Sequence, residues 1–185
     1  LGYGPGERLS YAETFERYAG VRVFDETDAE LRLRVKEFGV NDVDGLSRND
    51  LLDLVLTHVI EPKLGHCQPT FIHDYPASQA SLARIRDDDP PLAERFEVFA
   101  EGVEIANGYH ELTDPEEQRR RFKADIQNRE SQGLPTVPID ERLLAGLEYG
   151  LPDCAGVAIG VDRLIMLAFG SRNIADVLAF PIEYA

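Results

Sequence analysis

Apolar positions follow two different rhythms along this chain. In the first third they recur at the three- and four-residue spacing of amphipathic helices, and Ser10 and either Ser47 or Asn49 can cap two of these stretches. The helices predicted by this spacing span residues 10–18, 27–38 and 51–60. We therefore expect residues 1–65 to form a helical segment.

From residue 66 onward the pattern is that of strands separated by turns and helices. Short β-prone runs bounded by Pro, Gly and acidic residues predict four strand segments, at residues 70–75, 95–112, 154–161 and 176–180. The second segment folds back on itself, because Glu101-Gly102 is a two-residue turn. Three further helices are predicted, and their first residues can serve as caps: Thr113 or Asp114, Asp140, and Asp162.

Together these elements predict an α+β fold in which an antiparallel β-sheet is flanked by helices, rather than a series of β-α-β units. A length of 185 residues is enough for one domain with a real core. In this organisation residues 1–65 form the helical segment and residues 66–185 carry the sheet. No internal repeat divides the chain further.

The balance of charge argues against nucleic-acid and membrane binding. The net charge is −15, whereas affinity for phosphate backbones comes largely from Lys and Arg. One basic cluster, Arg119 to Arg121 with Lys123, lies in a helix rich in Glu and Gln, and a solvated helix face explains it. No apolar run approaches the ~20 residues of a membrane span, and the N-terminus has no signal pattern and no initiator Met. A processed chain, or a piece of a longer one, is consistent with that start.

Cys67 and Cys154 are the only cysteines, and two thiols so far apart do not form a disulfide framework. We therefore expect a reduced, cytoplasmic setting. His66 and His73 lie close to Cys67, but no second Cys or His pair has the spacing of a zinc site. The sequence does not support a zinc centre.

The predicted hairpin gathers acidic side chains on one face. With Glu101-Gly102 as the turn, Phe99 faces Glu104 and Glu97 faces Ala106, so the two glutamates share an open face. The opposite, apolar face should lie on the core; it carries Phe96, Val98, Val103 and Ile105. Either Glu97 and Glu104 are both solvated, or a cation lies between them. Mg²⁺ suits the second reading, because it binds one or two carboxylates together with phosphates.

Asn107-Gly108 follows this hairpin and tolerates the positive φ of a bulge or turn. Strict alternation along the strand would place Asn107 and Glu111 on the core face, where a carboxylate is unfavourable. Either the strand is irregular, or Glu111 has a buried cationic partner. That partner is the amino group of a substrate or a structural Arg.

Small residues dominate the segment from Ala155 to Gly160. Gly within a strand often marks close approach by a ligand, although tight packing of a helix on the sheet explains it equally. The spacing matches neither a P-loop nor the dinucleotide-binding fingerprint. Arg163 follows at the end of the strand. It can lie on an aromatic base and bind phosphate, or it can pair with a local carboxylate.

Together these segments resemble the class II aminoacyl-tRNA synthetases. GVAIGVDRLIML (156–167) is similar to motif 3 of that family, and AERFEVFAEGVEIANGYHELTDPEEQRRRF (93–122) is similar to the matching segment of the lysyl-tRNA synthetase group. YPASQASLA (75–83), LPDCAGVAIGVDRL (151–164) and VLAFPIEYA (177–185) resemble paralogues in that group that attach (R)-β-lysine to a lysine of elongation factor P. The resemblance covers essentially the whole chain and implies part of the class II catalytic-domain fold.

The resemblance implies an ATP end of the site. Glu97 and Glu104 match carboxylates that bind metal and ATP, and Ile105 follows in the stretch that contacts ATP. Gly160 matches a glycine beside ATP. Arg163 matches the motif 3 arginine that stacks on adenine and reaches the γ-phosphate, so Arg163 and Glu104 are the catalytic candidates.

The resemblance also implies an amino-acid end. Glu111 matches the acid that pairs with an amino group of the lysine substrate, and Asn107 lies in the same wall. Ala158 stands where lysyl-tRNA synthetases carry glycine. That change reshapes the amino-acid pocket.

The implied enzyme is a cytoplasmic ligase that uses ATP and Mg²⁺ and forms a homodimer when full length. It activates lysine or β-lysine as an adenylate, with elongation factor P as the acyl acceptor. A lysyl-tRNA synthetase, with tRNA as the acceptor, is the second hypothesis, which the acidic balance and Ala158 disfavour. A non-catalytic binding module is the third. Motifs 1 and 2, with the motif 2 arginine that binds phosphate, are not found in this sequence, which corresponds to the C-terminal part of the catalytic domain.

Overall fold

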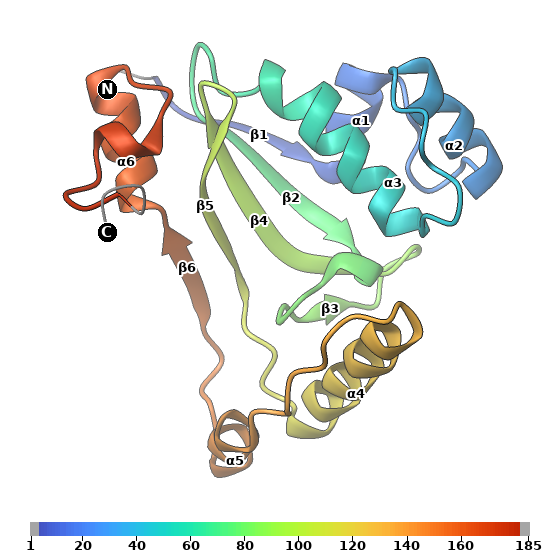
Figure 1. Cartoon of the computed structure of the whole chain (residues 1–185). Coiled ribbons are helices and arrows are strands. Elements are labelled where there is room, and N and C mark those ends of the chain that lie inside the picture. Colours follow the sequence, from blue (N-terminus) through green and yellow to red (C-terminus); the bar gives the residue numbers. More distant parts are fainter. Residues whose placement is uncertain (1–3, 182–185) are drawn as a thin grey trace.

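The computed structural model describes residues 4–181. Its strands form a six-stranded sheet in the order β1-β2-β4-β5-β6, with β3 paired to β4 (Figure 1). These strands are β1 (Glu7–Ser10), β2 (Thr70–Pro76), β3 (Ile85–Arg86), β4 (Leu92–Ala100), β5 (Val103–His110) and β6 (Ala155–Ile159). The α+β fold predicted from the sequence is confirmed.

Within residues 4–181, six α-helices accompany the sheet: α1 (Tyr11–Ala19), α2 (Asp28–Glu37), α3 (Arg48–Val55), α4 (Pro115–Ser131), α5 (Glu141–Tyr149) and α6 (Val161–Phe169). Ser10, Ser47, Asp114 and Asp140 each accept a backbone N–H at a helix start, so the predicted caps are confirmed. Asp162 is different, since α6 begins after Gly160 without a side-chain cap. Among residues 4–181, no helix has the length and apolar character needed to cross a membrane.

The sequence had predicted a helical N-terminal segment, but the structure shows that this segment is not wholly helical. Residues 7–10 form β1, which pairs in parallel with β2, so the sheet is mixed rather than purely antiparallel. A strand of four residues with a distant partner leaves no periodic signal. The predicted final strand at 176–180 is also wrong, because the 3₁₀ helix Ile174–Asp176 is followed by turns up to the last described residue.

The core lies where the N-terminal helices cover β1, β2 and β4 (Figure 1). Tyr11, Phe15 and Leu51 are fully buried there, and the rings of Tyr11 and Phe15 stack with centroids 4.3 Å apart. From the sheet, Tyr75 and Phe99 complete this cluster. The helical segment thus supplies most of the apolar burial.

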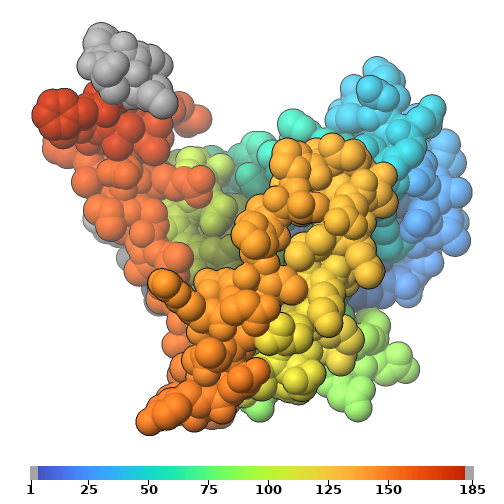
Figure 2. Space-filling view, turned by 60° about the horizontal axis from the view of Figure 1, so that its bottom comes forward, coloured from blue at the N-terminus to red at the C-terminus, as the bar shows by residue number. Residues whose placement is uncertain are grey.

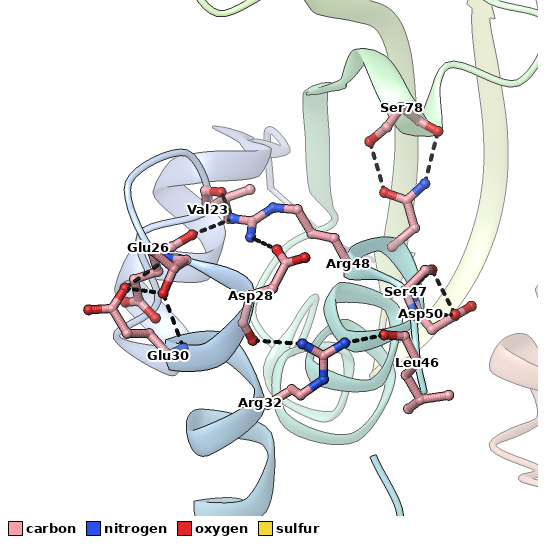
Figure 3. A network of polar contacts seen from close by, with 12 residues as sticks. Val23, Glu26, Asp28, Glu30, Arg32, Leu46, Ser47, Arg48, Asp50 and Ser78 are labelled. Carbon is pink, nitrogen blue, oxygen red and sulfur yellow. Dashed lines mark hydrogen bonds and ion pairs between the residues drawn. The ribbon is translucent and has the colours of Figure 1, made fainter. Parts of the chain in front are cut away.

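Polar contacts connect α3 to α2 and to the loop that precedes α2 (Figure 3). The Arg48 guanidinium donates to the carbonyls of Val23 and Glu26, at 2.6 and 2.8 Å, and to the Asp28 carboxylate at 2.6 Å. The next residue of α3, Asn49, exchanges two hydrogen bonds with Ser78 of the segment that follows β2, at 3.0 and 2.8 Å. The loop after β2 is therefore anchored to α3.

Candidate functional site

A bulge in β5 sets the geometry of the candidate site. Phe99 pairs with Glu104 as predicted, and Glu101 and Gly102 take the positive φ values of 51° and 73° that a two-residue hairpin turn needs. The next pairing is Val98 with the second residue after Glu104, so Ile105 is the extra residue. The bulge or turn predicted at Asn107-Gly108 is wrong, because both residues pair regularly with β4; the bulge lies two residues earlier, at Ile105.

The bulge brings Asn107 beside Glu97. These two residues pair directly, so the predicted pairing of Glu97 with Ala106 is wrong, and Ala158 pairs with Asn107 from β6. Paired residues share a face of a sheet, whereas neighbours along a strand alternate. One face of the sheet, named here the site face, therefore carries Glu97, Glu104, Asn107, Glu111 and Ala158.

The site face is covered at one end and open at the other. Over β2 and β4 it meets the helical core, so Phe99 is 0% exposed and Glu97 only 7%. The sequence had placed the core on the opposite face, with Phe96 and Val98, and an open face around Glu97. Val98 is buried, but Glu97 is not on an open face, and the main core cluster contains Phe99 from the site face instead. Over β6 the site face is uncovered, and Ala158 is exposed. Figure 2 shows the green strands recessed between the red C-terminal elements and the segment around α4.

Arg95 pairs with the buried Glu97 and was missed by the sequence analysis. Its Nη2 donates to Glu97 Oε1 at 2.5 Å, its Nη1 donates to the Gln79 carbonyl at 2.9 Å, and its guanidinium lies 4.7 Å from the centre of the Tyr75 ring. Asn107 Nδ2 also donates to Glu97 Oε1, at 3.3 Å. Burial raises the pKa of Glu97, and the Arg95 charge opposes that rise.

Arg163 lies at the other end of β6, next to Glu104. Its Nη1 donates to the Glu104 carbonyl at 2.7 Å and lies 3.5 Å from the Glu104 carboxylate. Of the two sequence readings, pairing with a local carboxylate is therefore present in the structure. Arg163 also lines a cavity of about 630 Å³ between the hairpin turn and α6, together with Val103, Met166 and Arg172. The Gly160 N–H bonds to the Ile105 carbonyl at 2.9 Å, which ties the bulge to the start of α6.

Glu111 closes the site face at the end of β5. Its backbone N–H donates to the Cys154 carbonyl at 3.0 Å, and its backbone bridges to Ala83. Its carboxylate leans back over Gly156: a Cβ built on Gly156 would meet Glu111 Oε1 at 2.5 Å. No buried Arg is paired with this carboxylate in the part of the chain that the structure describes. Of the two sequence readings, the structure shows the irregular strand.

Negative charge accumulates between the two ends of the site. Burial raises the pKa of Glu61, and the nearby charges of Glu97 and Glu104 raise it further. Glu104 likewise adds to the rise in the pKa of Glu97. Within residues 4–181 no group of three or more His, Cys, Asp or Glu side chains is placed to hold a metal ion. The chemistry of Glu97 and Glu104 fits a cation that takes one or two carboxylates and completes its shell with phosphate and water.

One arginine of the predicted solvated cluster is structural. Arg121 is only 17% exposed, pairs with Glu117 at 2.8 Å, and donates to the carbonyls of Ser81 and Ala83 at 3.0 and 2.7 Å. Burial lowers the pKa of Arg121. The solvated-face prediction is therefore wrong for this residue. Arg121 fixes the loop whose Ala83 bridges to Glu111, and nothing in a Glu- and Gln-rich helix distinguishes it from its exposed neighbours.

Known proteins match nearly the whole chain. The family model of the class II tRNA synthetases (D, K and N) matches residues 4–184. A protein of Klebsiella pneumoniae and one of Salmonella gallinarum, both named elongation factor P–(R)-β-lysine ligase, are each 47% identical over 183 residues, which is 98% of this chain and 56% of theirs. The chain spans about half the length of these curated relatives.

Proposed function

Because the chain belongs to the family of class II tRNA synthetases (D, K and N), we propose that it forms part of a catalytic domain that activates lysine or (R)-β-lysine with ATP and transfers it to a lysine of elongation factor P. One observation carries the proposal: the site face has a carboxylate, Glu111, at one end and Arg163 at the other, with small residues of β6 between them. That arrangement suits a substrate with an amino group at one end and a reacting carboxylate at the other.

At the amino-acid end, Glu111 would bind an ammonium group of the substrate through a charge-assisted hydrogen bond. Asn107 and Ala158 would form the adjoining wall. Since these two residues pair directly, the methyl group of Ala158 narrows the space beside the Asn107 amide. In this proposal the methyl group reshapes the amino-acid pocket relative to that of a lysyl-tRNA synthetase, which has glycine at this position.

At the nucleotide end, Arg163 would leave the Glu104 carboxylate and lie against the adenine and phosphates of ATP, next to Gly160 and Ile105. Gly160 leaves room for this movement, because a Cβ there would approach Arg163 Cδ to 3.2 Å. Arg163 is 46% exposed, so its reorientation costs little desolvation. Glu104 and Arg163 are the catalytic candidates.

Glu97 and Glu104 would hold Mg²⁺ at the nucleotide. When bound, Mg²⁺ supplies charge neutralisation for the phosphates. Glu97 is already fixed by Arg95 and Asn107, so it enters such a site with little loss of side-chain freedom. Glu104 is 36% exposed, and its carboxylate lies 3.5 Å from Arg163.

The proposed reaction has two steps. A carboxylate oxygen of the lysine attacks the α-phosphorus of ATP and pyrophosphate leaves, giving a lysyl-adenylate. The amine of an acceptor lysine then attacks the carbonyl carbon, and AMP leaves. The protein holds the reactants in line and forms no covalent bond to them. The phosphate-binding arginine of motif 2 and the dimer-forming motif 1 would come from sequence outside residues 1–185, in a cytoplasmic homodimer.

Two alternatives remain distinct from this proposal. A lysyl-tRNA synthetase would use the same residues with tRNA as the acceptor; Ala158 and the net charge of −15 disfavour it. A non-catalytic binding module would contain the site face but never activate an amino acid. Motifs 1 and 2 in the upstream reading frame would exclude the binding module.

The test is pyrophosphate exchange by the full-length protein with α-lysine and (R)-β-lysine, followed by acyl transfer to elongation factor P or tRNA. Replacing Glu111 by Gln should lower the exchange rate at subsaturating lysine by about a hundredfold, since the substrate ammonium loses its partner. Glu130→Gln, at an exposed site on α4, is the matched control. Transfer to tRNA alone would overturn the proposed acceptor, and an active Glu111→Gln variant would overturn the assigned role of Glu111.

A further inference from the structure

Gly156 lies directly beneath the Glu111 carboxylate. Tyr109 pairs with Gly156, and Asn107 pairs with Ala158, two residues later in β6. A side chain at position 156 would therefore point to the site face, as that of Ala158 does. A Cβ built on Gly156 would lie 2.5 Å from Glu111 Oε1, whereas ordinary contact begins at about 3.4 Å. The carboxylate occupies the space that any other residue would fill with its side chain.

The backbone of Glu111 cannot move to make room. Its N–H is held by Cys154, and the residues on either side of it are tied to the loop before β3: the Arg84 N–H donates to the His110 carbonyl at 2.9 Å, and the Leu112 N–H donates to the Leu82 carbonyl at 3.1 Å. Only the Glu111 side chain can yield. A side chain at position 156 would therefore displace the carboxylate itself.

Two other glycines, Gly108 in β5 and Gly65 in the loop before β2, differ in what they contact. A Cβ on Gly108 would meet the Gly156 carbonyl oxygen at 2.5 Å, and one on Gly65 would meet backbone atoms of Ala100 and Phe99 at 2.5 to 2.8 Å. Those contacts are with rigid backbone, so substitution there strains the fold. At Gly156 the obstructing atom is the far end of a flexible side chain, so substitution moves the carboxylate with little cost to the fold.

Strand β6 presents positions along the site face at regular intervals. Gly156 and Ala158 are successive residues on the site face, spaced by about 6.6 Å in an extended strand. Gly160 follows directly after the end of β6, at the start of α6. Gly160 adjoins Arg163 and Gly156 adjoins Glu111. The height of the Glu111 carboxylate above Gly156 thus fixes one end of the space that a substrate can occupy.

We propose that Gly156 is a specificity-determining residue, which sets the position of the Glu111 carboxylate and thereby the length of amino-acid substrate that the site accepts. The inference rests on the proposed function, in which Glu111 binds the substrate ammonium. A methyl group at position 156 lifts the carboxylate off the sheet, and the site no longer matches the lysine isomer that the native protein prefers.

The test uses the full-length protein with Gly156→Ala, and with Gly146→Ala as the matched control, because Gly146 is helical and a Cβ there meets nothing within 4 Å. Pyrophosphate exchange is measured with the preferred lysine isomer and with ornithine, which is one methylene shorter, alongside lysine binding by calorimetry and the melting temperature. For Gly156→Ala we expect KM for lysine to rise about tenfold or more, since misplacing a group by about 1 Å costs up to a hundredfold. The lysine-to-ornithine ratio of kcat/KM should fall, while the melting temperature stays near that of the native protein.

A second variant separates displacement of Glu111 from general damage to β6. Glu111→Asp withdraws the carboxylate by one methylene, so Gly156→Ala should weaken lysine binding less in that background than in the native one. Equal weakening in both backgrounds, or an unchanged KM and ornithine ratio in Gly156→Ala, would overturn the role of Gly156. A native protein that exchanges pyrophosphate with no lysine isomer would instead overturn the proposed function.

Discussion

The two edges of the sheet are built differently. At the β1 edge, the strands lie under α1 and α3, with fully buried Tyr11, Phe15 and Leu51 and arginines satisfied by backbone carbonyls. At the β6 edge, Val157 and Ile159 are each 54% exposed and Phe169 of α6 is 82% exposed. Apolar burial holds the first edge, whereas β6 is held mainly by its hydrogen bonds to β5. Strand β6, which carries the small residues of the proposed site, therefore contributes little to the free energy of unfolding.

This contrast predicts opposite outcomes for two phenylalanines. Phe15→Ala should lower the free energy of unfolding by about 3–5 kcal/mol, because it leaves a cavity in the helical core. Phe169→Ala should change it by no more than about 0.5 kcal/mol, because an exposed ring loses few contacts. Urea denaturation of both variants measures the difference. Similar losses for the two would mean that α6 contributes to the core as α1 does.

The ion pair of Arg95 with Glu97 lies between the buried β1 edge and the exposed β6 edge, and substitutions at both positions measure its contribution to stability. Arg95→Met should cost about 3 kcal/mol, because it leaves Glu97 buried without its cation. Arg95→Lys should cost less, since it keeps the charge but loses the planar contacts with Tyr75 and Gln79. Adding Glu97→Gln to Arg95→Met should restore much of the loss in urea midpoint. A double variant no more stable than Arg95→Met would show that the ion pair is not the cause.

The smallest effect concerns the face of the sheet opposite the site face. There His110 Nε2 lies 2.6 Å from Asp153 and Nδ1 lies 2.7 Å from Glu94, and these contacts, that with Asp153 first, raise the pKa of His110. A raised pKa means that the stabilisation is complete below the ordinary histidine value of about 6.5 and is lost as the pH rises through the folded-state pKa.

The urea midpoint of the native chain should therefore exceed that of His110→Gln by more at about pH 6 than at about pH 9. The effect is modest because Asp153 is 73% exposed. A gap between the two proteins that is constant with pH would contradict the prediction.

The sequence predicted the parts of this structure that have local causes. Glu101-Gly102 determines its own turn, and Ser10, Asp114 and Asp140 determine helix starts, because the chemistry acts within a few residues. Strand β1 and the bulge at Ile105 depend on partners far along the chain, and an isoleucine gives no sign of a bulge.

The candidate site also combines features that could be predicted from local sequence with features that depend on distant partners. Glu97, Glu104, Asn107 and Glu111 could be named from the sequence, but their common face could not be derived, because it depends on the bulge. Arg95 carried no signal either, since its partners Gln79 and Tyr75 come from another strand and loop. Residues that support a site through tertiary contacts are harder to predict than those in its motif.

The bulge at Ile105 also affects how this strand tolerates deletions. Loss of one residue from a regular strand turns every following side chain to the wrong face of the sheet. Loss of Ile105 would instead leave Glu104 next to Ala106 in an unbroken ladder, with Asn107 still beside Glu97. The chain would give up the bond between Gly160 and the Ile105 carbonyl. Position 105 is thus a point in β5 where one residue can be deleted while the following side chains keep their faces of the sheet.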